Sequence, residues 1–152
     1  MTPNQMLAQA IALAATAHRD QTDKAGRPYI LHTLKVMHYL RSDDDELNAI
    51  AVLHDIVEDT TVTYKDLIDY SMSERIIRGV AAMTKQRGQT ADEYLAQVLA
   101  NPDAIRVKMA DLRHNSDIRR LKGVTQKDID RIEKYNKMYD VLKAALKDHG
   151  SN

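Results

Sequence analysis

The stretch AVLHDIVEDT, residues 51–60, places four titratable side chains directly after an apolar run. His54-Asp55 follows three apolar residues, and Glu58-Asp59 comes after two more. Adjacent residues of a helix point about 100° apart, so His54 and Asp55 reach one point only near the edge of a helix face. The stretch therefore has three interpretations: a metal site, a site of proton chemistry, or an acidic helix end.

A metal site needs more ligands than this stretch provides. An imidazole nitrogen and a carboxylate oxygen suit a divalent cation, and the best further candidates by context are His32 and Asp111. Two His and two Asp suit Mn²⁺, Zn²⁺ or Fe²⁺, and such a cation can lower the pKa of a bound water to near neutrality. Spacing alone does not separate this site from a solvated helix end.

The flanking sequence has the periodicity of helices almost throughout, and no segment alternates long enough to predict a strand. Capping boxes are expected at Thr63, Thr90 and Thr125, each with an acidic residue three positions later. A loop is predicted over 21–29. The predicted helices span about 3–17, 31–40, 43–57, 73–83, 91–100, 102–121 and 126–146, and a further short helix is predicted to begin at Thr63. We therefore predict one all-α domain of about eight helices.

Composition limits the classes of protein and of site. The chain has 152 residues, 43% hydrophobic and 29% charged, which is typical of a globular domain. It has no cysteine, so a metal would be held by histidines and carboxylates. We expect neither a signal peptide nor a membrane span. Lys+Arg and Asp+Glu balance at 22 each, so no whole-molecule attraction to nucleic acid is expected, although a local basic pocket can still bind a phosphorylated ligand.

Three motifs carry a resemblance to a known family: HRDQTDKAGRPYILH (18–32), LHDIVEDT (53–60) and KMADLRHN (108–115). They resemble the hydrolase domain of RelA/SpoT-type alarmone enzymes, within the HD phosphohydrolase superfamily, and the chain length is similar to that of the small alarmone hydrolases. The resemblance implies a single all-helical HD domain over 1–152. It implies removal of the 3′-pyrophosphate from guanosine tetra- or pentaphosphate, giving GDP or GTP and pyrophosphate. It also implies a divalent cation, typically Mn²⁺.

The same resemblance assigns roles residue by residue. His32, His54, Asp55 and Asp111 are the implied metal ligands, and Glu58 and Asp59 are the implied acids that position or activate water. The implied substrate contacts are Lys24, Tyr29, Asn115, Arg131 and Tyr135. We expect a cytoplasmic enzyme of the stringent response that binds a small nucleotide and neither nucleic acid nor membrane. The sequence does not indicate an oligomeric state.

Two departures from the family pattern are visible. Asp23-Lys24 stands where the long enzymes often carry Arg-Lys, so an arginine that could stack on the base is absent, and adenosine alarmones remain possible substrates. Thr33 stands in place of the usual proline, which affects a helix start more than the chemistry. The alternatives are another HD phosphohydrolase, acting on a nucleoside monophosphate, an adenosine alarmone or a redox dinucleotide phosphate, and a catalytically silent nucleotide- or partner-binding module.

Overall fold

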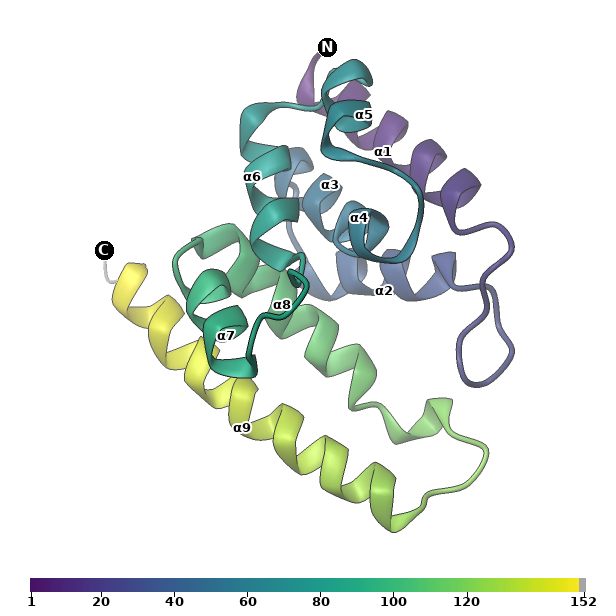
Figure 1. The fold of residues 1–152 in the computed structure, drawn as a ribbon, viewed down its shortest axis with the longest axis vertical. Coiled ribbons are helices and arrows are strands. Elements are labelled where there is room, and N and C mark those ends of the chain that lie inside the picture. Colours follow the sequence, from purple (N-terminus) through teal and green to yellow (C-terminus); the bar gives the residue numbers. More distant parts are fainter. Residues whose placement is uncertain (151–152) are drawn as a thin grey trace.

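The computed structural model describes residues 1–150, which form nine α-helices and one short 3-10 helix (Figure 1). Within these residues, the only β-type pairing is an isolated bridge between Thr22 and Pro28 in the loop after the first helix. The predicted all-α class is confirmed. The helices are α1 Pro3–Ala17, α2 Ile30–Leu40, α3 Asp45–Leu53, α4 Ile56–Asp59, α5 Tyr64–Asp69, α6 Glu74–Met83, α7 Ala91–Leu99, α8 Pro102–Asn115, the 3-10 helix η1 Ile118–Arg120, and α9 Gln126–His149.

Local capping signals set most helix starts. The side chains of Thr63, Thr90 and Thr125 each accept a backbone N–H three residues later, and the acidic residue at that position bonds back to the threonine N–H. These are the three predicted capping boxes, each of which satisfies two backbone donors that the helix itself leaves free. Thr2 and Gln5 form a fourth, at the start of α1. The helix starts therefore follow from short-range sequence.

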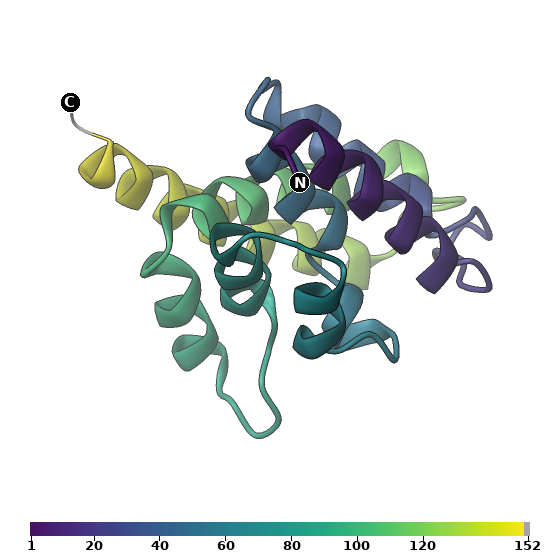
Figure 2. The same cartoon turned by 90° about the horizontal axis from the view of Figure 1, so that it is seen from above.

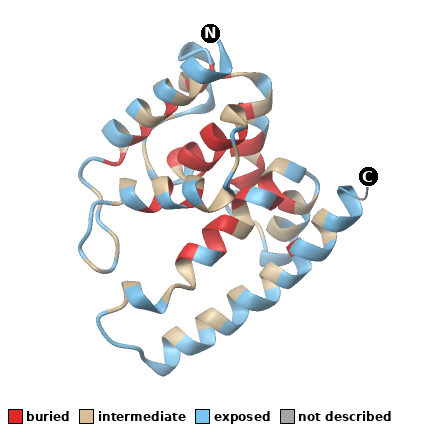
Figure 3. Cartoon of the chain, turned by 180° about the vertical axis from the view of Figure 1, so that it is seen from behind, coloured by how far each residue is buried: buried red, intermediate tan, exposed pale blue. Residues whose placement is uncertain are grey.

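The core is organised around α3. Every residue from Leu47 to Leu53 is buried, and α3 packs against α1, α2, α6 and α8. Figure 3 shows the buried residues concentrated in the middle of the fold and on the inner side of α8, while the outer helices are largely exposed. A helix that is enclosed on all sides is apolar all round, which explains why residues 47–53 carry no charge. The C-terminal end of α3 consequently lies in the interior of the molecule.

The helix predicted over 43–57 is wrong at its C-terminal end, because it is interrupted at His54-Asp55. Helix α3 ends at Leu53, a two-residue turn follows, and α4 starts at Ile56 as a separate single turn. The imidazole Nδ1 of His54 bonds the carbonyl oxygen of Ala51 at 2.7 Å. A continuing helix would offer that carbonyl to the backbone N–H of Asp55. The histidine side chain thus competes with the helix ladder at this point.

The helix predicted over 102–121 also ends early. Helix α8 stops at Asn115, and Asp117 starts η1 by accepting the backbone N–H of Arg119 at 3.0 Å. The carbonyl of His114 accepts the N–H of Asp117 at 3.2 Å, a bond three residues apart that tightens the last turn. The short polar side chain of Asp117 therefore competes with the helix, as aspartate commonly does.

Helix α9 has 24 residues and lies along α8 (Figures 1 and 2). Among the residues that the structure describes, Leu142 is its one buried side chain, so α9 covers the domain from outside. Its first turns lie near the end of α8, which places Arg131 and Tyr135 on the same side as the loop at 21–29. No helix in residues 1–150 combines the length and the apolar character needed to cross a membrane.

Candidate metal centre and adjoining cavity

Three helical segments bring the four predicted metal ligands to one place. His32 lies on α2, His54-Asp55 forms the turn between α3 and α4, and Asp111 lies on α8. His32, His54 and Asp55 each offer a ligand atom, and these atoms lie within 4.8 Å of one another. The Oδ1 atom of Asp111 lies 2.9 Å from Nε2 of His32 and 3.4 Å from Nε2 of His54. Residues 79 positions apart in sequence thus face a single point.

The turn after α3 prepares His54 as a ligand. Because Nδ1 bonds the carbonyl of Ala51, that nitrogen carries a proton, and in the neutral ring Nε2 has the lone pair that a cation would take. Nε2 is buried and makes no hydrogen bond within residues 1–150, although Oδ2 of Asp55 lies 3.0 Å away. Burial disfavours protonation, but Asp55 and Asp111 outweigh it and raise the pKa of His54 well above its ordinary value. The surroundings of Nε2 therefore favour a positive charge.

These features fit a divalent cation. Two imidazoles and two carboxylates form a donor set that suits Mn²⁺, Fe²⁺ or Zn²⁺. A cation held by Asp55 and Asp111 would supply the positive charge that His54 otherwise obtains from a proton. Buried carboxylates are costly unless they are paired or coordinate a metal. The donor chemistry and the buried lone pair of His54 Nε2 thus agree with the predicted ligand set.

Lys108 supports Asp111 from one turn earlier on α8. Its Nζ lies 3.2 Å from Oδ2 of Asp111, and both side chains are largely buried. Burial alone would raise the pKa of Asp111, but Lys108, His32 and His54 hold it well below its ordinary value. Our sequence analysis missed Lys108, although its spacing of three residues from Asp111 is that of a helical ion pair.

The ligands have further partners on their outer side. Nδ1 of His32 bonds Nδ1 of His114 at 2.7 Å, and the hydroxyl of Tyr29 donates to Oδ2 of Asp55. Burial, followed by the charges of Arg120 and His32, lowers the pKa of His114 to about 4, so His114 is neutral near pH 7. Such outer partners orient the first ligands of a metal site. From the sequence alone, His114 could not be distinguished from an ordinary polar residue at a helix end.

The acidic pair of α4 lies next to the candidate metal ligands. Asp55, Glu58 and Asp59 each offer a carboxylate oxygen within 4.8 Å of the others. Burial, and then the charges of Asp55 and Glu58, raise the pKa of Asp59. The backbone of Asp59 is tied to the loop by Gln21, whose Nε2 donates to its carbonyl at 2.8 Å. A new turn of helix therefore aims the acidic pair, because α3 does not continue that far.

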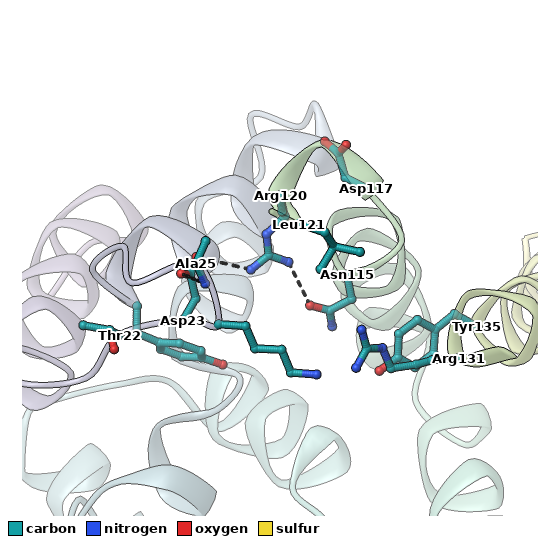
Figure 4. A pocket seen from close by; sticks show the side chains of 11 residues that line it. Thr22, Asp23, Ala25, Asn115, Asp117, Arg120, Leu121, Arg131 and Tyr135 are labelled. Carbon is teal, nitrogen blue, oxygen red and sulfur yellow. Dashed lines mark hydrogen bonds and ion pairs between the residues drawn. The ribbon is translucent and has the colours of Figure 1, made fainter. Parts of the chain in front are cut away.

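Beside the metal centre lies a cavity of about 300 Å³, between the loop at 21–29, the end of α8 and the start of α9 (Figure 4). All five residues predicted to contact substrate line it: Lys24, Tyr29, Asn115, Arg131 and Tyr135. The cavity is also lined by Asp23, which the sequence analysis noted as a departure from the family pattern, and by Thr22, Ala25, Asp117, Arg120 and Leu121, which it did not single out. The loop, α8 and α9 approach one another only in the folded chain.

The cavity and the metal centre share two residues. Tyr29 lines the cavity and donates its hydroxyl hydrogen to Asp55. Asn115 lines the cavity and donates from Nδ2 to Oδ1 of Asp111 at 3.2 Å. A molecule in the cavity would thus lie directly beside the candidate ligands.

Positive side chains face this cavity. Arg131 is held by Asp128, with Nη2 2.6 Å from Oδ1, and Asp128 is also the residue that closes the capping box of α9. Lys24 comes from a second wall, the loop at 21–29. Cations from two walls suit a ligand with several phosphate groups, since arginine and lysine donate charge-assisted hydrogen bonds to phosphate oxygens. The arrangement can therefore hold an anionic ligand and present one end of it to a bound cation.

Comparison with known proteins places these residues in a family context. The sequence model described as "HD domain" matches residues 10–121, which include all four candidate ligands. The bifunctional (p)ppGpp synthase/hydrolase SpoT of Escherichia coli is 35% identical over 123 residues, covering 72% of this chain and 17% of that protein. The guanosine-3′,5′-bis(diphosphate) 3′-pyrophosphohydrolase of Vibrio cholerae is 32% identical over 134 residues, covering 82% of this chain and 19% of its own length. The chain thus spans about a fifth of these curated relatives.

A solved structure shares the fold. It is described as a metazoan ortholog of SpoT that hydrolyzes ppGpp, and it superposes with a TM-score of 0.74 over 97% of this chain and 95% of its own. Its sequence identity is 22%, so the likeness concerns the fold.

Proposed function

The chain belongs to the HD domain family, and on that premise we propose that it is a metal-dependent phosphohydrolase that removes the 3′-pyrophosphate of guanosine tetra- or pentaphosphate. The products would be GDP or GTP and pyrophosphate. The observation that carries the proposal is the contact between the two parts of the site, where Tyr29 and Asn115 line the cationic cavity and bond candidate metal ligands. Relatives named for this reaction support the choice of substrate.

We propose that His32, His54, Asp55 and Asp111 hold the cation and that this cation is Mn²⁺. When bound, a divalent cation offsets phosphate charge and makes a nearby water more acidic. Asp59 and Glu58 would take the proton of the attacking water, and burial beside Asp55 and Glu58 makes Asp59 a stronger base by raising its pKa above the ordinary value. Water oxygen attacks the phosphorus next to the ribose, the bond between phosphorus and the 3′-oxygen breaks, and the 3′-oxygen takes up a proton.

The cavity residues would bind the rest of the nucleotide. Lys24 and Arg131 would neutralise phosphate oxygens, and the ion pair with Asp128 at 2.6 Å would restrain the guanidinium of Arg131. Asn115 would donate to the substrate beside Asp111, and Tyr135 would contact the sugar or the base. We further propose one HD-type domain over 1–152, in a cytoplasmic protein whose partner is a small nucleotide rather than nucleic acid or membrane.

Asp23 favours a second candidate, the adenosine alarmones. It lines the cavity at the place where related enzymes often carry an arginine, so a guanidinium is absent from this part of the loop. The chemistry at the 3′-pyrophosphate would be unchanged, because the ligands and acids do not depend on the base.

The test is a pyrophosphate-release assay on the purified protein with Mn²⁺, comparing guanosine and adenosine tetraphosphates. We expect turnover of at least one substrate, loss of it with EDTA, and recovery with added Mn²⁺. Turnover that survives EDTA would reject the metal-dependent mechanism. Tight binding of the intact tetraphosphate in calorimetry, without turnover under any metal, would instead identify a silent binding module.

A further inference from the structure

Arg120 joins two walls of the cavity. It lies on η1, and its Nη2 is 3.5 Å from Oδ2 of Asp23 on the loop. Its Nη1 donates to the carbonyl of His114 at 3.1 Å and to Oδ1 of Asn115 at 3.2 Å. Figure 4 shows the guanidinium between Asp23 on one side and Asn115 on the other. One side chain therefore connects the loop to the last turn of α8.

These contacts determine how the amide of Asn115 is oriented. A guanidinium has donors and no acceptor, so it can only face the oxygen of the amide. With Oδ1 turned toward Arg120, Nδ2 points the other way and donates to Oδ1 of Asp111 at 3.2 Å. The opposite orientation would set the amide hydrogens against the guanidinium and the amide oxygen against the carboxylate of Asp111. Arg120 thus makes Asn115 a donor on the side of the metal centre.

An arginine suits this position better than any other cation. The carbonyl of His114, in the last turn of α8, accepts the backbone N–H of Asp117 with one lone pair and Nη1 of Arg120 with the other. Oδ1 of Asp23 already accepts the backbone N–H groups of Ala25 and Arg27, which leaves Oδ2 for Arg120. A planar guanidinium can serve these three acceptors at once, whereas an ammonium on a flexible stem is a single point charge.

We propose that Arg120 is a positioning residue of the substrate cavity, which fixes the amide of Asn115 and locks the loop at 21–29 against α8. The inference rests on the proposed function, since it concerns the same cavity. It adds a residue that lies outside the three sequence motifs and that no pattern in the sequence indicated. Asp23, which departs from the family pattern, then serves as the anchor of Arg120 rather than as a contact to the base.

The first test is kinetic, on the Mn²⁺-loaded protein with guanosine tetraphosphate, or with adenosine tetraphosphate if that is the better substrate. Arg120→Gln should raise KM about tenfold and change kcat less than about threefold, because the residue acts on binding rather than on the reacting atoms. Arg120→Lys should recover part of the loss. Arg119→Gln is the matched control, because Arg119 is its exposed neighbour, pairs with Asp117 and does not line the cavity.

A second variant covers the case in which Arg120→Gln folds poorly. Asp23→Asn keeps the oxygen that accepts the loop N–H groups and removes the charge that Arg120 faces, so KM should rise about threefold with an unchanged melting temperature. If both variants fold and have the KM of Arg119→Gln, the inference is overturned.

The second test does not depend on turnover. In metal-free protein, the side-chain NH₂ signals of Asn115, assigned by their loss in Asn115→Ala, should shift in Arg120→Gln and stay in place in Arg119→Gln. Unmoved signals in Arg120→Gln would overturn the positioning role. An inactive wild type with the expected shift would instead reject the proposed reaction and leave the role of Arg120 supported.

Discussion

Nδ1 of His32 lies 2.7 Å from Nδ1 of His114, and the two rings stack with their centroids 4.9 Å apart. Two nitrogens at this distance share one hydrogen, so one donates and the other accepts. His32 needs a free lone pair on Nε2 to bind a cation, which requires the proton on Nδ1. His114, which is neutral near pH 7 because its pKa is about 4, must then be the acceptor. A residue outside the candidate ligand set thus selects the tautomer of His32.

Replacing His114 should weaken metal binding. His114→Phe keeps an aromatic ring of similar size and removes the acceptor for His32, so the affinity for Mn²⁺ should fall about 10- to 100-fold, as for other outer partners of metal-binding histidines. Isothermal titration calorimetry with Mn²⁺ measures the change. His38→Phe, at an exposed position of the same helix as His32, serves as the control. Equal affinities in His114→Phe and wild type would show that His114 does not orient His32.

Removing a candidate ligand should remove both metal and turnover. Asp55→Asn keeps the shape of the side chain but replaces a carboxylate oxygen by a donor, so we expect metal content near zero after purification and no measurable hydrolysis. Elemental analysis and the pyrophosphate assay test this, with Asp20→Asn, a fully solvated position, as control. His54→Ala should behave in the same way. Stoichiometric metal in Asp55→Asn would exclude Asp55 from the ligand set.

Replacing Glu58 should lower the rate of hydrolysis without lowering the metal content of the protein. Oε1 of Glu58 accepts the backbone N–H of Lys85 at 2.7 Å, a contact that glutamine can keep. Glu58→Gln therefore isolates the loss of the carboxylate, and kcat should fall about 10²- to 10⁴-fold with metal content unchanged, as expected for loss of acid–base catalysis. Glu58→Ala should lose rate as well. An unchanged kcat in Glu58→Gln would leave Asp59 as the sole candidate base.

Arg75 should stabilise the fold in a pH-dependent way. It reaches Asp44 at 2.8 Å, Glu46 at 3.2 Å and Asp103 at 2.9 Å, and so connects α6 with the first turns of α3 and α8. Because these side chains are partly exposed, Arg75→Gln should lower the free energy of unfolding by only about 1 kcal/mol at pH 7. Urea unfolding measures it, and the exposed Arg78→Gln, on the same helix, should change little.

The sign of the pH effect follows from Asp44. The hydrogen bonds from Arg75 hold the pKa of Asp44 below its ordinary value. A carboxyl with a lowered pKa in the folded state contributes stability above its ordinary pKa of about 4, and this contribution is lost as the pH falls through the folded-state pKa. The difference between wild type and Arg75→Gln should therefore shrink below about pH 4. A difference that stays constant down to pH 2 would contradict this origin.

Gly79 is required by packing. A β-carbon at Gly79 would lie 2.5 Å from Cδ1 and 2.8 Å from Cγ1 of Ile50, in the centre of the core. Gly79→Ala should therefore destabilise the protein by about 1–2 kcal/mol, since overpacking outweighs the gain in helix propensity. Thermal unfolding measures this. Gly123→Ala, where a β-carbon meets nothing within 4 Å, should be close to neutral, and Ile50→Val should offset part of the cost in the double variant.

The sequence predicted those features of the fold that depend on interactions between residues close together in the chain. The capping boxes of Thr63, Thr90 and Thr125 act over three residues, so the helix starts could be predicted from local sequence. The predictions were wrong at two helix ends, after Leu53 and after Asn115. In both places a polar side chain, His54 or Asp117, competes with the backbone hydrogen bonds of the helix. The spacing of apolar residues, from which the helices were predicted, carries no information about such a competition.

The residues of the candidate site likewise fall into those that the sequence predicted and those that it missed. Its candidate metal ligands could be predicted because they lie in motifs that resemble a known family. Of the residues that were missed, Lys108 pairs with Asp111 one turn away on the same helix, whereas His114 and Arg120 acquire their roles from partners that the fold brings close. Arg120 is 97 positions from Asp23 in sequence, and the partners of the Asp111 carboxylate include His32 on α2 and His54 in the turn after α3. No periodicity in the chain encodes such pairings.

The sequence by itself determined that the chain is helical and where most helices begin, because backbone hydrogen bonds and caps are satisfied within a few residues. Only the tertiary structure decided that His32, His54 and Asp111 face one point, and that Arg120 spans from Asp23 to Asn115. The physical reason is burial: α3 is enclosed on all sides, and packing four helices around it sets the positions of the side chains at its end.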